Sequence, residues 1–228
     1  MTDFYTDAQG RRRPIRGKGT GAVVAGALTL GLFASSGGAV SLGGGATVGE
    51  VGAAQAGSSA SLQLRARKSE GQKAARRGDA DAAWQRMGLR QLRRATGQQI
   101  ECVAVSYGRV REFFTRHRCA SLDRMLFAVA DKTGNTAVVS VVWVRMARTS
   151  DARKFRTLMD EHGTGDITPL GARLLDLANV TFTGLRYGSD RDGRSVTIAE
   201  AENAAGGRFD HDTLDAIAEV AAHLPRVG

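Results

Sequence analysis

The polar loop from His162 to Pro169 holds the residues whose types and spacing come closest to a chemical site. His162, Thr164 and Asp166 lie near one another there, separated by glycines. A histidine beside a carboxylate can move a proton or bind a polar ligand, and surface loops often carry such groups. The pattern favours a structural turn, in which Gly163 ends a helix and the Thr and Asp side chains bond to the backbone. These residues are therefore candidates for binding, without a catalytic role.

Two further candidate binding residues, Glu200 and Glu202, alternate along an apolar segment. On a strand, both carboxylates would lie on one face, where they could bind a cation together with Asp166 or His211. A solvated strand face is the interpretation that the pattern favours. The chain has no Gly-x-Ser-x-Gly, no His-Glu-x-x-His and no glycine-rich phosphate loop. We therefore assign no catalytic residue, no metal site and no cofactor.

The chain contains two cysteines, Cys102 and Cys119. An even number of cysteines in an exported domain favours a disulfide, and its closed loop would stabilise the fold by about 3 kcal/mol. The alternative is a pair of buried free thiols. A structural metal site would need more ligands than these two residues supply.

Residues 98–228 have the pattern of a folded α+β domain. Ala137 to Val144 is apolar on both faces, which is typical of a central strand covered on both sides. Gly134 suits the turn of a hairpin that ends in this strand. Strands are predicted at 100–106, 122–131, 135–146, 180–187 and 195–202, and helices at 107–117, 151–162, 171–178 and from Asp210 or Asp212 to Pro225. We expect a mainly antiparallel sheet with helices packed on one face, and a ferredoxin-like topology is one candidate.

Charge organises the N-terminal part of the chain. A basic tail, 1–18, precedes a stretch at 19–49 that has no charged residue. The apolar part of this stretch is long enough to cross a bilayer, although its glycines and alanines make it weakly hydrophobic. We predict a transmembrane segment or signal anchor at 19–41, with a cytoplasmic N-terminus and an external C-terminal domain. One alternative is a signal peptide cleaved near Ala56, which would give a secreted protein. Another is a disordered tail on a cytosolic protein.

The region between this segment and the domain is basic. We predict a flexible Gly/Ala-rich and basic linker at 42–79 and an amphipathic helix at 80–97 that contains Trp84. Residues 1–97 hold 15 Lys or Arg and 6 Asp or Glu, whereas 98–228 hold 17 of each sign. The stretch 63–97 could contact anionic lipid or an envelope polymer, but packing of Trp84 on the domain is favoured. Because the domain is neutral, we predict no nucleic-acid partner.

Several short segments of the chain form a familiar set. They are Cys102, Val110–Phe114, His117-x-Cys119, Ser121–Arg124, Gly134–Thr136, Trp143-Val144, His162–Leu170 and Ala199–Glu202. Together they resemble a group of uncharacterised actinobacterial membrane-anchored proteins. The resemblance covers nearly the whole chain, including the Gly-rich N-terminal part, and it implies a single-pass anchor and an extracytoplasmic domain without a known activity.

Three functional hypotheses fit these observations. The leading one is a non-enzymatic extracytoplasmic domain, anchored by one helix, that binds a ligand or an envelope protein. The second is an envelope hydrolase that uses His162, Asp166 or Glu200. The third is a cytosolic protein whose disordered basic tail touches nucleic acid.

Overall fold

A computed structural model describes residues 4–6, 12–14, 48–99, 101–171, 175 and 180–226. Within these ranges no helix combines the length and the apolar character that a bilayer crossing requires. The predicted membrane segment at 19–41 and most of the predicted helix at 171–178 lie outside the described residues. In the predicted basic tail, β1 (Phe4–Thr6) and β2 (Arg12–Pro14) pair antiparallel.

The main sheet has five strands, and every neighbouring pair is antiparallel. Its order is β3-β4-β5-β7-β6. The predicted α+β class and antiparallel sheet are confirmed. The ferredoxin-like candidate is wrong, because that fold contains two split βαβ units, in which a helix joins two strands that flank a third, and here only β5 and β6 are joined in this way, across β7. The strands are β3 (Leu89–Gln99), β4 (Cys119–Asp131), β5 (Thr136–Met146), β6 (Tyr187–Asp192) and β7 (Ser195–Asn203).

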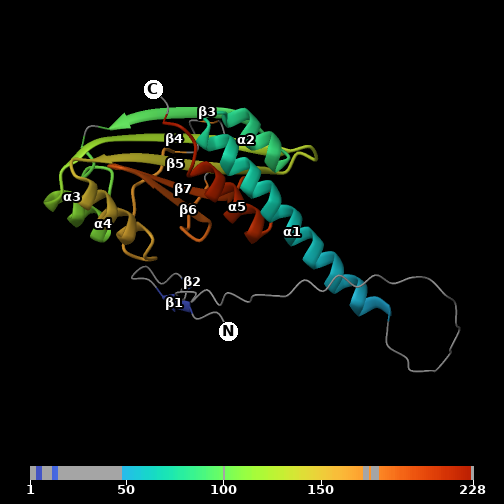
Figure 1. Ribbon diagram of the computed structural model, residues 1–228. Helices are drawn as coiled ribbons and strands as arrows, with labels where there is room; N and C mark the ends of the chain where they lie inside the picture. The colour runs from blue at the N-terminus through green and yellow to red at the C-terminus, as the bar shows by residue number, and fades with distance from the viewer. Residues whose placement is uncertain are drawn as a thin grey trace, which may run out of the picture.

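Helices cover both faces of this sheet, so the expectation of helices on one face is wrong (Figure 1). The reason lies in β5, whose Val139, Val141 and Trp143 pack into one buried cluster while Val142, Val144 and Met146 pack into another. The strand is therefore covered on both sides, as its apolar pattern predicted. One face carries α1 (Val48–Arg76), α2 (Ala80–Met87) and α5 (His211–Ala221), and the other carries α3 (Gly108–Arg116) and α4 (Thr149–Met159).

The folded domain begins well before residue 98. Helix α1 occupies most of the range predicted as a flexible linker, and its Ala74 and Ala75 are buried in the core. The predicted helix at 80–97 ends at Met87, because Gly88 adopts a left-handed conformation (φ 75°) and the chain then pairs with β4 as strand β3. Trp84 is buried against Phe127, with 5.5 Å between ring centroids, so packing of Trp84 on the domain is confirmed.

Other helix and strand boundaries differ from the predicted ones by a few residues. Residues 102–105 form turns rather than a strand, and Ser106 makes an isolated β-bridge with Ile167. The Ser106 hydroxyl donates to the carbonyl of Cys102 instead of capping α3. Strand β6 begins at Tyr187, where we expected its last residue. The β4–β5 hairpin is confirmed, with Gly134 at φ 89°, and so is the Asp210 cap of α5.

Candidate binding cleft

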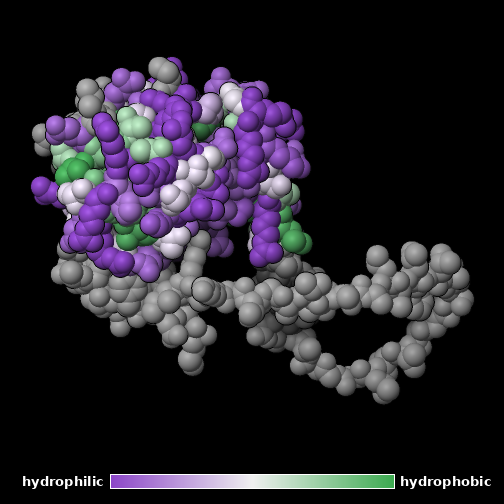
Figure 2. Space-filling model, turned by 60° about the vertical axis from the view of Figure 1, so that its left-hand side comes forward, coloured by the Kyte–Doolittle hydropathy of each residue, from purple (hydrophilic) through white to green (hydrophobic). Residues whose placement is uncertain are grey.

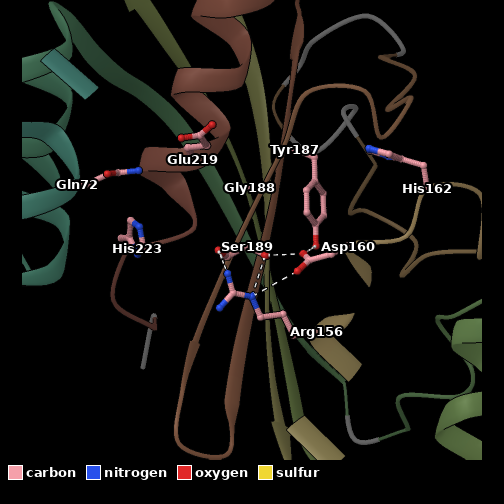
Figure 3. A pocket seen from close by; sticks show the side chains of 9 residues that line it. All are labelled: Gln72, Arg156, Asp160, His162, Tyr187, Gly188, Ser189, Glu219 and His223. Carbon is pink, nitrogen blue, oxygen red and sulfur yellow. Dashed lines mark hydrogen bonds and ion pairs between the residues drawn. The ribbon is translucent and has the colours of Figure 1, made fainter. Parts of the chain in front are cut away.

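A polar cleft of about 480 Å³ lies along the outer edge of β6, between the two helical layers. Figure 3 shows Arg156, Asp160, His162 and Tyr187 on one side of the cleft and α1 and α5 residues on the other. Gly188 lets α5 approach β6 closely, because a Cβ there would lie 2.6 Å from the carbonyl oxygen of Ala218. The lining comprises Gln72, Arg156, Asp160, His162, Tyr187, Gly188, Ser189, Glu219 and His223.

The backbone of β6 presents to this cleft hydrogen-bonding groups that do not bond to β7. The amide of Ala201 donates to the carbonyl of Arg186 (3.0 Å), which fixes which β6 residues bond to β7. Since bonded and non-bonded pairs alternate in an antiparallel ladder, the backbone groups of Tyr187, Ser189 and Arg191 point away from β7. Among the described residues, no other strand pairs with this edge.

Arg156 partly covers this edge. Its Nε donates to the Ser189 hydroxyl (3.2 Å), and its Nη2 donates to the Ser189 carbonyl (3.4 Å). Both the Ser189 hydroxyl (2.7 Å) and the Tyr187 hydroxyl (3.0 Å) donate to Oδ1 of Asp160. Burial, followed by the nearby Asp160 carboxylate, raises the pKa of Tyr187 well above its usual value. The phenol is therefore a stable donor that holds Asp160 at the wall of the cleft.

On the opposite wall, His223 contacts residues from two other elements. Arg76 can only donate, so its 3.0 Å contact with Nε2 makes that nitrogen the acceptor and leaves the proton on Nδ1. Nδ1 lies 3.3 Å from Oδ2 of Asp190. Burial lowers the pKa of His223, against the opposing effect of Asp190. His223 is therefore neutral at neutral pH and lies, just after α5, between Arg76 of α1 and Asp190 of β6.

Charges in the cleft are compensated. Arg156 Nε lies 3.6 Å from Asp160 Oδ2, and Lys68 Nζ lies 2.6 Å from Glu219 Oε2. With Tyr187 protonated and His223 neutral, these two pairs contribute no net charge to the walls. Such a lining suits a ligand that carries both donors and acceptors and has no net charge.

The predicted loop site is mainly structural. The Thr164 hydroxyl donates to the carbonyls of Leu158 (2.9 Å) and Glu161 (3.1 Å), and the Asp166 carboxylate accepts from the amide of Ile167 (2.7 Å). The carbonyls of Thr164 and Asp166 accept from the amides of Arg109 and Tyr107 at the start of α3. The loop thus satisfies donors that the helix leaves open. Only His162 among these three candidates lines the cleft.

Glu200 and Glu202 do share one strand face, but that face is covered rather than solvated. Oε2 of Glu200 accepts from the amide of Gly184 (2.8 Å), and Oε1 of Glu202 accepts from the amide of Thr183 (3.2 Å). Arg186 completes the cluster, 3.4 Å from Glu202. Both carboxylates therefore hold the segment before β6 in place. Among the described residues, no group of three or more His, Cys, Asp or Glu side chains could hold a metal ion.

The cysteine pair agrees with the prediction. Cys102 and Cys119 are bonded, with their Cα atoms 6.3 Å apart, and they join the turns before α3 to the start of β4. Cys102 is buried in the same cluster as Val110 and Phe114. The disulfide therefore ties α3 to the sheet on the face opposite α1.

Most residues of the cleft were missed from the sequence. Arg156 and Asp160 stand four apart in a helix, which is the spacing of an ordinary surface ion pair. Ser189 was expected in a turn, and His223 in a terminal helix. Their convergence depends on the position of β6, for which the local pattern gave no signal. No family model, no curated protein and no solved structure matches the chain.

Proposed function

We propose that this protein is a binding module that takes an extended segment of a partner protein as an added strand beside β6. The observation that carries the proposal is an edge of β6 inside a polar cleft with which no strand of the described residues pairs. Peptides commonly bind in this way, with backbone hydrogen bonds supplying affinity and flanking pockets supplying specificity. Here the flanking pockets would be formed by Tyr187 and Asp160 on one side and by Gln72 and His223 on the other.

The lining also favours a particular kind of peptide. Arg156 is paired with Asp160, and Lys68 is paired with Glu219. A charged peptide side chain that entered the cleft would therefore find no unpaired charge of opposite sign. A segment of uncharged polar residues can instead both donate to Asp160 and accept from Gln72. Arg156 then limits non-specific strand pairing, since a charged side chain over an edge strand disfavours pairing with other chains.

Strand addition predicts a specific difference between two substitutions at Ser189. Ser189→Ala and Ser189→Pro both lose the hydroxyl contacts with Arg156 and Asp160. Only Ser189→Pro also loses the outward amide, and neither change removes a bond to β7. Peptides selected on the full chain from a displayed library of random linear peptides should bind the Ala variant within about threefold of wild type. They should bind the Pro variant at least about tenfold more weakly.

Amide hydrogen exchange provides a second readout, because the Ser189 amide should exchange more slowly when a selected peptide is bound. The proposal is overturned if no peptide is enriched, or if the Pro variant binds the selected peptides as tightly as the Ala variant does. Thermal unfolding of both variants controls for loss of the fold.

We further propose that the chain is anchored by 19–41, with the N-terminus in the cytoplasm and the domain outside. The charge asymmetry around this segment supports the proposal. The disulfide agrees with an oxidising compartment, in which such bonds persist. Cleavage near Ala56 is the competing outcome and would release the domain from the membrane.

Reporter fusions at the C-terminus should distinguish these locations. Alkaline phosphatase fused after residue 228 is expected to be active and membrane-bound, whereas a fluorescent protein at the same position should be dark. Activity in the medium would favour cleavage. A bright fluorescent fusion together with an inactive phosphatase would contradict export.

A further inference from the structure

We propose that a second site, at the end of the sheet opposite the N-terminal part of α1, binds a linear phosphate-bearing polymer. Backbone pairing brings four arginines to this end of the sheet, although residues 98–228 as a whole are neutral. We call this surface the arginine end and define it by Arg118, Arg145, Arg148 and Arg194. All four are exposed. Figure 2 turns this side of the molecule, with α3 and α4, toward the viewer and shows it as largely hydrophilic.

Backbone pairing brings the four residues together from distant parts of the sequence. The amide of Ala147 donates to the carbonyl of Arg118 (3.0 Å), and the amide of Met146 donates to the carbonyl of Arg194 (2.9 Å). Residues 118 and 194 therefore flank the end of β5 on either side, where Arg145 and Arg148 lie. Two strand spacings separate the flanking segments, which is about 10 Å.

This arrangement is electrostatically unfavourable without a ligand. Among the described residues none of the four arginines forms an ion pair with a carboxylate; the guanidinium of Arg194 instead donates to the carbonyl of Ala147 (3.5 Å). The arginine end also surrounds the start of α4, where Arg148 is the N-cap residue and no side chain caps the helix. Positive charge is unfavourable beside a helix N-terminus. Asp151, the acidic residue of the first turn, is buried beside His117, 3.2 Å away.

The shape and composition of the surface indicate the kind of anion. Arginine binds phosphate oxygens in bidentate fashion, and four exposed cations across about 10 Å can engage successive phosphates of one chain. The exposed large apolar residues of the described chain, Leu62, Leu92 and Tyr107, lie on α1, on β3 and before α3. The arginine end therefore offers neither aromatic platforms for nucleobases nor apolar side chains that enter a bilayer.

The basic residues of α1, α2 and β3 provide a contrast. Acidic side chains intervene among them, as in the 2.7 Å Lys73–Glu70 pair, and Lys68 is bonded to Glu219. Arg67, Arg77, Arg86 and Arg90 are exposed there and carry the same total charge as the arginine end. They serve as a matched control that separates a defined site from general basicity.

Long-chain inorganic polyphosphate is the probe for this proposal, added to the full chain in non-ionic detergent. Replacing all four residues of the arginine end by glutamine should weaken binding at least tenfold. Replacing the four control arginines by glutamine should change it less than about threefold. The slope of log affinity against log salt should become shallower by about 3 for the first variant only, since each of the four phosphate contacts contributes roughly 0.7–0.9.

Equal losses for the two quadruple variants would overturn the proposal, as would unchanged salt slopes. Vesicles of phosphatidylglycerol and single-stranded DNA are added in separate experiments. Tighter binding of either than of polyphosphate, with the same dependence on the arginine end, would also overturn the assignment to a phosphate polymer. Matching thermal midpoints of the variants and the wild type would show that the fold is retained.

Discussion

Gly165→Ala is expected to lower the free energy of unfolding by more than about 3 kcal/mol, whereas Gly134→Ala should lower it by only about 1 kcal/mol. Both glycines have positive φ angles, 104° and 89°. The backbone penalty for alanine is therefore similar at the two positions. The difference comes from the surroundings.

A Cβ on Gly165 would lie 2.2 Å from the carbonyl oxygen of Tyr107 and 2.9 Å from Cα of Gly108, whereas nothing lies within 4 Å of a Cβ on Gly134. Relief of the clash would separate the 162–168 loop from the start of α3. The amides of Tyr107 and Arg109 would then lose their acceptors. Repacking and unsatisfied donors each cost about 1–3 kcal/mol.

Chemical denaturation of both variants, followed by circular dichroism, would measure this difference. Equal destabilisation by the two substitutions would contradict the close packing of the loop on α3. His162 lines the cleft, so the shape of the cleft should also change in Gly165→Ala. It should not change in Gly134→Ala, because Gly134 lies in the distant β4–β5 turn.

Trp84→Ala is expected to destabilise the domain by about 3–5 kcal/mol, as is usual when a large buried aromatic side chain is removed. Trp84 is 1% exposed and packs against Phe127, so its loss leaves a cavity between α2 and the sheet. Its buried indole nitrogen has no hydrogen-bond partner among the described residues. Trp84→Phe also removes this unpaired nitrogen, so it should lower the free energy of unfolding by less than the lost side-chain volume alone would suggest.

Leu92→Ala, on the neighbouring strand β3, is the control. Leu92 is 38% exposed, and its truncation should change the free energy of unfolding by less than about 1 kcal/mol. Urea unfolding of the three variants would provide the comparison. A loss below about 1 kcal/mol for Trp84→Ala would mean that α2 is peripheral and that the domain begins near residue 98 after all.

Strand β5 was predictable because its apolar pattern has one physical explanation. Val138 to Val144 is apolar at every position except Ser140, so only a strand covered on both sides can bury it. Strand β3 was not predictable in the same way. Its leucines, arginines and glutamines are good helix formers, and pairing with β4 overrides that preference.

The candidate site was predictable only in part, because glycine, histidine and carboxylate residues mark turns as well as binding sites. His162 was identified by type and does line the cleft. Thr164 and Asp166 belong to the turn that the pattern favoured. Arg156 and Ser189 lie 33 positions apart and meet through the sheet, so no local pattern could join them.

Helix α1 sets how far the domain can stand from its point of attachment. Its 29 residues span roughly 43 Å at 1.5 Å per residue, and Leu64 is the first of its described apolar side chains that packs against the core. The part before Leu64 projects beyond the sheet in Figure 1 and adds about 24 Å of reach. If the chain is anchored as proposed, this arm works as a spacer that lifts the β6 cleft above the lipid headgroups. The cleft would then lie farther from the bilayer than it would without this arm.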